Sequence, residues 1–278
     1  MALSMFNSVE EFENWMEPAT QKVVEYTGEH LKYLPFFFAV FAAIYFAAHI
    51  GWGMYGLKGR KKANLASCCM SLLHGSVTSA SAAWQIYSHL PFSLDAPNNA
   101  AQDILMQFST AYMLADEFLF LLPCTPDDYL FIFHHVVTVG YMLSSLFLRR
   151  GGLSCLILMF MGEITSPVQN TWFIGRDLRG TSKVANTVYE LMSPPYTYIY
   201  LFVRSGVAPP LIAWFAWRLV TLGGPLPASV RYTWAFCAVL ATTGSQIWSM
   251  KLFKGLQRHM AKGEPATEAS GKAAQKEL

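Results

Sequence analysis

Among the ionisable residues inside long apolar stretches of the sequence, four come from four different stretches and could meet in a helix bundle. They are His74, Asp116, His134 and Glu163. An ionised side chain at the centre of a bilayer costs about 2.5–3.5 kcal/mol on insertion scales, so such residues usually face the interior of a helix bundle and pair there. An imidazole near a carboxylate can act as an oriented nucleophile, bind a polar group or pass protons. These four positions therefore define a candidate functional site.

Two of the positions have an ionisable neighbour that leaves the choice of residue open. His134 is followed by His135, and adjacent residues of an α-helix point about 100° apart. His135 could set the tautomer of His134, form a structural hydrogen bond, or be the reactive residue itself. Asp116 is followed by Glu117, which could pair elsewhere. The candidate catalytic residues are His134, His135, Asp116 and Glu163.

Polar side chains also recur along one face of six apolar stretches, because residues at i, i+4, i+7 and i+11 share a helix face. The six faces are Ser67, Ser71, His74, Thr78, Ser81 and Gln85; Ser109, Tyr112 and Asp116; His134, Thr138, Tyr141 and Ser145; Glu163, Ser166 and Asn170; Asn186, Glu190, Ser193, Thr197 and Arg204; and Thr242, Gln246 and Ser249. Turned inward, these faces would line one polar chamber. The hydroxyl groups of the first face are explained more simply by close helix packing.

Several residues on these faces are candidates for binding a substrate. They are His74, Thr138, Tyr141, Ser166, Asn170 and Arg204. Arg204 is either a counter-ion for Asp116 or Glu163, or a phosphate contact near the membrane surface.

The sequence has one His-His pair without a second histidine box, and its five cysteines form no CxxC pattern, so we expect no metal and no cofactor.

The elements that carry these residues predict an all-α polytopic membrane protein. Hydrophobic residues make up 53% of the chain and charged residues 14%, against roughly 25% charged in a soluble domain. A spanning helix needs about 20 mostly apolar residues. Seven stretches qualify: Tyr33–Leu57, Asn64–Leu90, Ile104–Leu122, Tyr129–Leu148, Gly152–Ile174, Val184–Leu222 and Tyr232–Leu252. We expect about seven helices that form a barrel around the polar chamber.

The sixth stretch is too long for one straight span. It contains Pro194-Pro195 and Pro209-Pro210, which should kink or break it, so eight spans is the alternative count. The net charge of +2, without a basic stripe, gives no reason to expect nucleic-acid binding.

The distribution of lysine and arginine predicts the orientation in the membrane. Basic residues gather after the first, fifth and seventh stretches: Lys58, Arg60, Lys61 and Lys62; Arg176, Arg179 and Lys183; Lys254, Arg258 and Lys262. With seven spans all three groups are cytosolic, and only Arg149 and Arg150 violate the pattern. We therefore expect a lumenal amphipathic segment (1–31), a transmembrane domain (32–258) and a disordered cytosolic tail (259–278).

The order of several motifs resembles that of TLC-domain proteins, a membrane family that includes translocation-associated membrane proteins and ceramide synthases. The run Asp-Asp-Tyr-Leu-Phe-Ile-Phe-His-His-Val-Val-Thr at 127–138 resembles the central family motif. Further resemblances are Leu72–Gly75 in the second helix, Tyr112–Asp116 in the third, Glu163–Asn170 in the fifth, and Arg204 followed by Pro209 in the sixth. The resemblance covers roughly Lys32 to Arg258.

This resemblance implies a helical barrel in the endoplasmic reticulum or a related membrane that acts on lipids. Ceramide synthases use their histidine pair to transfer an acyl group from acyl-CoA to a long-chain base, and they carry two aspartates downstream of the pair. This chain instead has Glu163, Ser166 and Asn170, and it has no long loop with a homeobox-like segment. Acylation of a sphingoid base is therefore not what the sequence predicts.

Three functional hypotheses follow. In the first, the protein serves lipid homeostasis or metabolism and binds an acyl lipid in the chamber around the His-His pair. In the second, it is a lipid acyltransferase in which His134 or His135 attacks the thioester of acyl-CoA as co-substrate, while Asp116 or Glu163 orients the imidazole. The third is a proton-linked transporter, although the helices show no inverted repeat. A membrane lipid or acyl chain is the expected partner, and homodimer formation is left open.

Overall fold

The computed structural model describes residues 28–91, 93–122, 124–222 and 224–262. These residues form helices joined by short turns, which confirms the predicted all-α fold. Of the predicted lumenal segment, only residues 28–31 are described, and its amphipathic part lies outside the described residues. Of the predicted tail, only residues 259–262 are described, and they continue the last helix.

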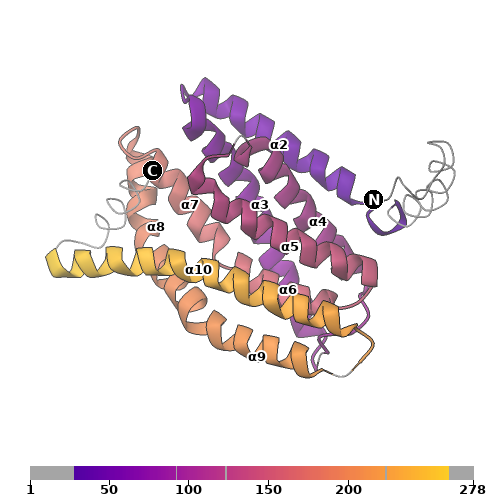
Figure 1. Cartoon of the computed structure of the whole chain (residues 1–278). Coiled ribbons are helices and arrows are strands. Elements are labelled where there is room, and N and C mark those ends of the chain that lie inside the picture. Colours follow the sequence, from indigo (N-terminus) through magenta and orange to yellow (C-terminus); the bar gives the residue numbers. More distant parts are fainter. Residues whose placement is uncertain (1–27, 92, 123, 223, 263–278) are drawn as a thin grey trace, which may run out of the picture.

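The helices follow one another without strands among the described residues (Figure 1). In chain order they are α2 (Leu34–Met54), α3 (Gly59–Ser88), α4 (Ala100–Asp116), the π-helix η2 (Glu117–Leu121), the 3-10 turn η3 (Pro126–Asp128), α5 (Tyr129–Leu148), α6 (Gly152–Glu163), α7 (Ser166–Asp177), α8 (Lys183–Leu201), the π-helix η4 (Phe202–Val207), α9 (Ala208–Thr221) and α10 (Ala228–Lys262). Helix α3 packs against α2, α4, α6 and α7, while α10 packs along α9 and α5.

Five helical stretches of the described residues are long and apolar enough to cross a membrane: Leu34–Met54, Ala100–Leu121, Tyr129–Leu148, Gly152–Asp177 and Lys183–Thr221. Helices α3 and α10 are longer than 18 residues but are not among them. Helix α3 is enclosed by four other helices and buries polar side chains such as His74 and Thr78, which lowers its hydropathy. The polytopic membrane architecture is therefore supported, and the count of seven spans stays a prediction.

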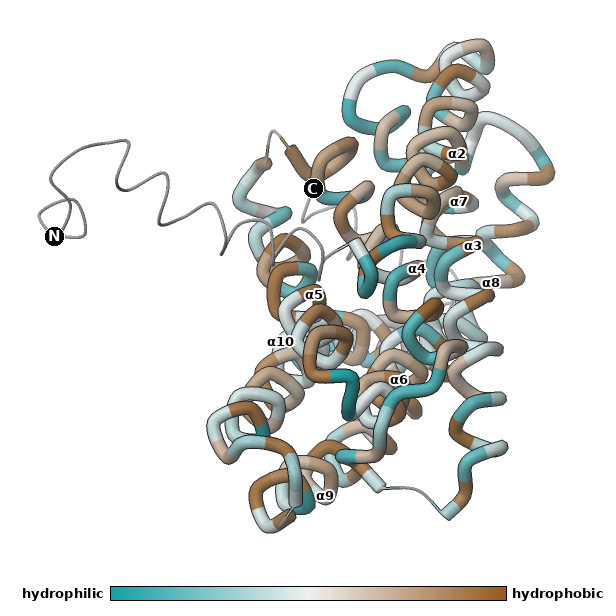
Figure 2. Tube along the Cα trace, turned by 90° about the vertical axis from the view of Figure 1, so that its right-hand side faces the viewer, coloured by the Kyte–Doolittle hydropathy of each residue, from teal (hydrophilic) through white to brown (hydrophobic). Residues whose placement is uncertain are grey.

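The outer surface of the bundle carries large hydrophobic side chains. Exposed examples on five different elements are Ile50, Trp84, Phe118, Val136 and Trp217. Hydrophobic and polar stretches alternate along the helices (Figure 2). A soluble monomer rarely exposes so much contiguous apolar surface, so these side chains face the lipid.

The predicted span Gly152–Ile174 is two helices rather than one. Helix α6 ends at Glu163, a turn follows at residues 164–165, and α7 begins at Ser166. Pro167 occupies the first turn of α7, where its missing N–H is tolerated, whereas inside a continuous helix it would remove a hydrogen bond. Glu163 therefore ends one helix while Ser166 starts the next, and their predicted common face is interrupted.

The long stretch from Lys183 to Thr221 turns at the second proline pair. Pro194 and Pro195 lie inside α8, which continues to Leu201. The π-helix η4 follows, and Pro209 lies in the first turn of α9. Figure 1 shows the chain changing direction between α8 and α9. The sequence predicted a break at one of the two proline pairs. The structure shows that it occurs at Pro209-Pro210 and not at Pro194-Pro195.

The basic loops after α2 and α7 lie at the same end of the bundle. Asn64 at the start of α3 donates a hydrogen bond of 2.8 Å to Asp177 at the end of α7. Leu65 and Leu178 pack in one hydrophobic cluster. Of the two arginines that violate the charge pattern, Arg149 pairs with Asp103 at 3.4 Å. Arg150 donates to the backbone oxygen of Asp95 at 3.0 Å. Both exceptions thus have local partners.

The turn between α5 and α6 depends on Gly151. Its φ of 77° is in the left-handed region, and a β-carbon there would lie 2.5 Å from Cη2 of the buried Trp234. We expect Gly151→Ala to lower the free energy of unfolding by about 2–5 kcal/mol, because left-handed backbone costs about 1–2 kcal/mol and overpacking about 1–3 kcal/mol. Thermal unfolding in detergent measures the effect. Gly140→Ala, with no atom near the added carbon, is the control. Equal melting temperatures for the two variants would contradict the prediction.

Candidate functional site

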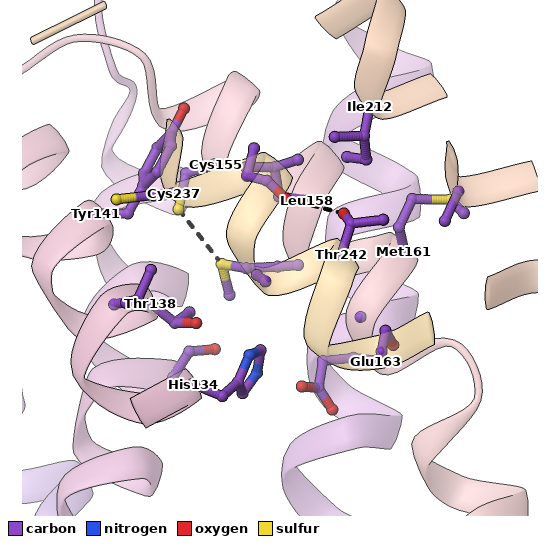
Figure 3. Close-up of a pocket in the computed structure, with 18 of the residues that line it drawn as sticks. His134, Thr138, Tyr141, Cys155, Leu158, Met161, Glu163, Ile212, Cys237 and Thr242 are labelled. Atoms are coloured by element: carbon purple, nitrogen blue, oxygen red, sulfur yellow. Dashed lines mark hydrogen bonds between the residues drawn. The ribbon is translucent and has the colours of Figure 1, made fainter. Parts of the chain in front are cut away.

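A cavity of about 90 Å³ lies between α3, α4, α5, α6, α9 and α10. Its polar lining comes from His74, Ser109, His134, Thr138, Tyr141, Glu163, Arg204, Thr242 and Ser245, and much of the rest is methionine, cysteine, alanine and branched aliphatic side chains. In Figure 3, His134 and Glu163 lie beside each other at one end, and Tyr141, Cys155 and Ile212 lie at the other. The cavity is therefore polar at one end and largely apolar at the other.

The start of α5 fixes the position of His134. The carboxylate of Asp128 accepts hydrogen bonds from the backbone N–H and the hydroxyl of Thr125, at 2.8 and 2.7 Å, which closes a capping box at the start of η3. Arg60 pairs with the same carboxylate at 2.6 Å. One and a half turns further along, His134 points into the cavity. Among the described residues, no hydrogen bond reaches its ring and no carboxylate oxygen lies within 4.0 Å of its nitrogens.

His135 points in a different direction and does not line the cavity. Its Nδ1 lies 3.4 Å from Oε2 of Glu117, and its ring meets Tyr112 edge-on at 6.3 Å. The centroids of the two histidine rings are 6.1 Å apart, and no hydrogen bond joins them. Of the three roles left open for His135, the structural contact is the one that these distances favour. Glu117 is its partner, which the sequence left unassigned.

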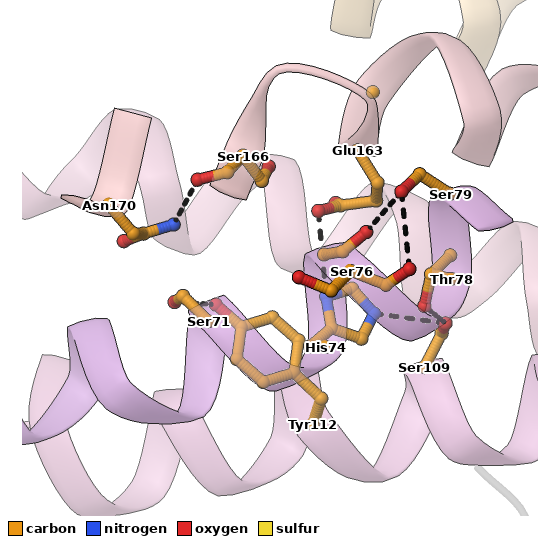
Figure 4. A network of polar contacts seen from close by, with 12 residues as sticks. Ser71, His74, Ser76, Thr78, Ser79, Ser109, Tyr112, Glu163, Ser166 and Asn170 are labelled. Carbon is orange, nitrogen blue, oxygen red and sulfur yellow. Dashed lines mark hydrogen bonds and ion pairs between the residues drawn. The ribbon is translucent and has the colours of Figure 1, made fainter. Parts of the chain in front are cut away.

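His74 is held from three sides at the polar end of the cavity (Figure 4). Its Nδ1 lies 3.6 Å from Oε2 of Glu163, and its Nε2 lies 3.0 Å from the hydroxyl oxygen of Ser109. Its ring stacks on Tyr112 with centroids 4.0 Å apart and an interplanar angle of 12°. These contacts join α3 to both α4 and α6, and they place His74 beside the carboxylate of Glu163.

Close packing of α3 on α7 brings this pair together. A β-carbon at Gly75 would lie 2.7 Å from Cβ of Ser166 and 3.3 Å from Oε2 of Glu163. Glycine therefore allows an approach of the two helices that any larger residue would prevent. The backbone oxygen of Ser166 accepts a hydrogen bond of 2.9 Å from Asn170. Ser166 thus belongs to this packing surface, Asn170 bonds back to its own helix, and neither residue lines the cavity.

Asp116 and Arg204 make separate contacts. Asp116 is buried outside the cavity and accepts a hydrogen bond of 2.5 Å from Ser67. Arg204 lines the cavity and donates to Ser245 at 3.1 Å and to the backbone oxygen of Gly162. Among the described residues, no carboxylate oxygen lies within 4.0 Å of its guanidinium nitrogens. The direct ion pair with Asp116 or Glu163 that the sequence allowed is therefore absent from this part of the chain.

Comparison with known proteins identifies the family. A family model for the TLC domain matches residues 64–254. A TLC domain-containing protein of Arabidopsis thaliana is 34% identical over 230 residues, which cover 79% of this chain and 88% of the relative. This chain belongs to the TLC-domain family. Its members are generally membrane proteins of lipid metabolism, and the resemblance predicted from the motifs is confirmed. No solved structure matches the chain.

The matched region of this TLC-domain protein includes most of α3 and α10 and all of the other helices that line the cavity. Six of the ten candidate site residues line the cavity: His74, His134, Thr138, Tyr141, Glu163 and Arg204. Four do not: His135, Asp116, Ser166 and Asn170. Ser245 is the main polar lining residue absent from the predicted faces. It lies three residues after Thr242, and an i, i+3 spacing would have found it.

Proposed function

We propose that this TLC-domain protein binds an acyl lipid in the cavity, with the polar part of the lipid against His134 and the acyl chain along the apolar lining. The observation that carries the proposal is the His134 imidazole, which faces the cavity without a hydrogen bond from the described residues. His134 is half-buried, and a hydrogen bond typically contributes about 0.5–1.5 kcal/mol net. A ligand that supplies a hydrogen bond to His134 would gain this free energy.

The apolar lining supports an acyl chain as the second part of the ligand. Met113, Met159 and Met161 contribute to it, together with Leu158 and Ile212. The volume of about 90 Å³ is below the roughly 300–1,000 Å³ of pockets that hold drug-sized molecules. Because methionine is unbranched and adapts to irregular spaces, we expect these side chains to shift when a long chain enters.

Binding is better supported than acyl transfer. A histidine nucleophile needs an orienting group. The two carboxylates considered for that role contact other residues, Glu163 facing His74 at 3.6 Å and Asp116 facing Ser67 at 2.5 Å.

The proposed location is the endoplasmic reticulum membrane with a cytosolic C-terminus. Support for the orientation comes from the basic loops after α2 and α7, which lie at one end of the bundle.

Mass spectrometry of lipids that copurify with the protein tests the proposal. Ala241 lines the cavity, whereas Ala213 is exposed on α9. We expect Ala241→Phe to lose at least about nine-tenths of the copurifying lipid because the ring fills the cavity, a loss equivalent to about 1.4 kcal/mol. Ala213→Phe should retain it.

Three results would decide against the proposal. They are wild-type protein without bound lipid, equal retention by Ala241→Phe and Ala213→Phe, and an acyl mass attached covalently to His134. The last result would support acyl transfer instead.

A further inference from the structure

We infer that the ligand of the cavity carries an acidic head group, a carboxylate or a phosphate, which binds to Arg204. This inference rests on the proposed lipid binding and specifies the class of lipid. Arg204 lies in the π-helix η4, near the middle of the long apolar stretch Lys183–Thr221, and it lines the polar end of the cavity.

The contacts of the Arg204 guanidinium are all with neutral groups. Nε and Nη2 lie 3.4 Å from the hydroxyl oxygen of Thr165, Nη1 donates to Ser245 at 3.1 Å, and Nη2 donates to the backbone oxygen of Gly162. The guanidinium also lies 5.5 Å from the ring centroid of Tyr200. These partners satisfy hydrogen bonds but do not neutralise the positive charge. A charge inside a membrane protein is usually paired, because its transfer from water is expensive.

Glu163 is the one acidic residue among those that line the cavity, and the residue that its carboxylate meets directly is His74. Its Oε2 lies 3.6 Å from Nδ1 of His74, whereas no oxygen of Glu163 lies within 4.0 Å of Arg204. Glu163 therefore meets His74 directly, and among the described residues Arg204 has no carboxylate in direct contact. An acidic head group would provide that contact.

The chemistry of the remaining polar groups also suits an anion. Arginine presents planar N–H groups that match the oxygens of a carboxylate or phosphate. His134 lines the same cavity and can donate a second hydrogen bond to the same head group. A neutral lipid such as a fatty alcohol would use His134 but would leave the charge of Arg204 uncompensated.

Ser245 offers a way to supply the missing charge from within the protein. Its hydroxyl is 3.1 Å from Nη1 of Arg204, so Ser245→Asp would place a carboxylate beside the guanidinium. Ser245→Asn has nearly the same size and no charge. The protein is reconstituted in nanodiscs, and the affinities of three probes with the same chain are measured: oleic acid, oleoyl lysophosphatidic acid and oleyl alcohol.

We expect wild-type protein to bind at least one acidic probe about tenfold or more tightly than the alcohol, as is typical of charge-assisted hydrogen bonds. Which acid binds more tightly distinguishes a fatty-acid carboxylate from a lipid phosphate. Ser245→Asp should lose this preference, whereas Ser245→Asn should keep it. Arg218→Gln, which removes an exposed cation of α9, should also keep it.

Equal binding of all three probes to wild-type protein would overturn this inference and leave lipid binding intact. Binding of no probe would overturn both proposals. If Ser245→Asp fails to fold, Arg204→Lys and Arg204→Gln provide the second comparison. We then expect the lysine variant to keep the preference for acids and the glutamine variant to lose it, and retention by both variants would count against the inference.

Discussion

Replacing His134 by glutamine should reduce the lipid that copurifies with the protein by about tenfold or more, whereas His135→Gln should leave it nearly unchanged. His134 faces the cavity, and the hydrogen bond that it offers to a charged or strongly polar head group is worth about 1.5–3 kcal/mol. His135 faces Glu117, outside the cavity lining. Quantitative lipid mass spectrometry on the two purified variants measures the difference.

The same two variants should differ in stability in the opposite order. His135→Gln removes a buried imidazole that lies 3.4 Å from Oε2 of Glu117 and meets Tyr112 edge-on, so the free energy of unfolding should fall by about 0.5–3 kcal/mol. His134 has no hydrogen-bond partner among the described residues, so its replacement should change the stability of the lipid-free protein little. Equal lipid loss in both variants would show that the histidines act as one pair, contrary to the geometry.

A β-carbon at Gly75 should disrupt both the packing and the site. In Gly75→Ala the new carbon would lie 2.7 Å from Cβ of Ser166, so α3 and α7 must move apart. Overpacking of this kind costs about 1–3 kcal/mol, and the separation should also pull His74 away from Glu163. We expect a lower melting temperature together with reduced lipid retention. Thermal unfolding and lipid mass spectrometry on the same preparation measure the two effects.

The double variant Gly75→Ala, Ser166→Gly tests whether this clash is the cause, because it removes the Cβ of Ser166 with which the new carbon collides. If the clash is the cause, the double variant should recover much of the stability that Gly75→Ala loses, a coupling expected only for residues in contact. Gly51→Ala on α2, with no atom within 4 Å of the added carbon, serves as the neutral control. Absence of rescue would mean that Gly75 matters for a reason other than its approach to α7.

The candidate residues therefore divide into two groups. His134 and Arg204 face the cavity with hydrogen-bonding capacity or charge that the described residues leave unmatched. His135 and Asp116 have partners in other helices and hold the bundle together. Neighbouring positions of one motif can thus serve different purposes, since adjacent residues of a helix point about 100° apart.

In an unbroken helix, sequence periodicity was sufficient to predict which side chains share a face. In α5 the spacing of His134, Thr138 and Tyr141 predicted a common face, and all three line the cavity. The hydrogen bonds of a regular helix fix the direction of each side chain locally, so composition and spacing were enough to predict the all-α membrane fold and this face of the site.

Tertiary structure decided which faces meet and where the helices are interrupted. The turn at residues 164–165 separates Glu163 from Ser166, so only the glutamate reaches the cavity. The pairing of His74 with Glu163 joins residues 89 positions apart, and that of Glu117 with His135 joins two different helices. Such contacts depend on how segments distant in the sequence pack, which helical periodicity within one segment does not specify.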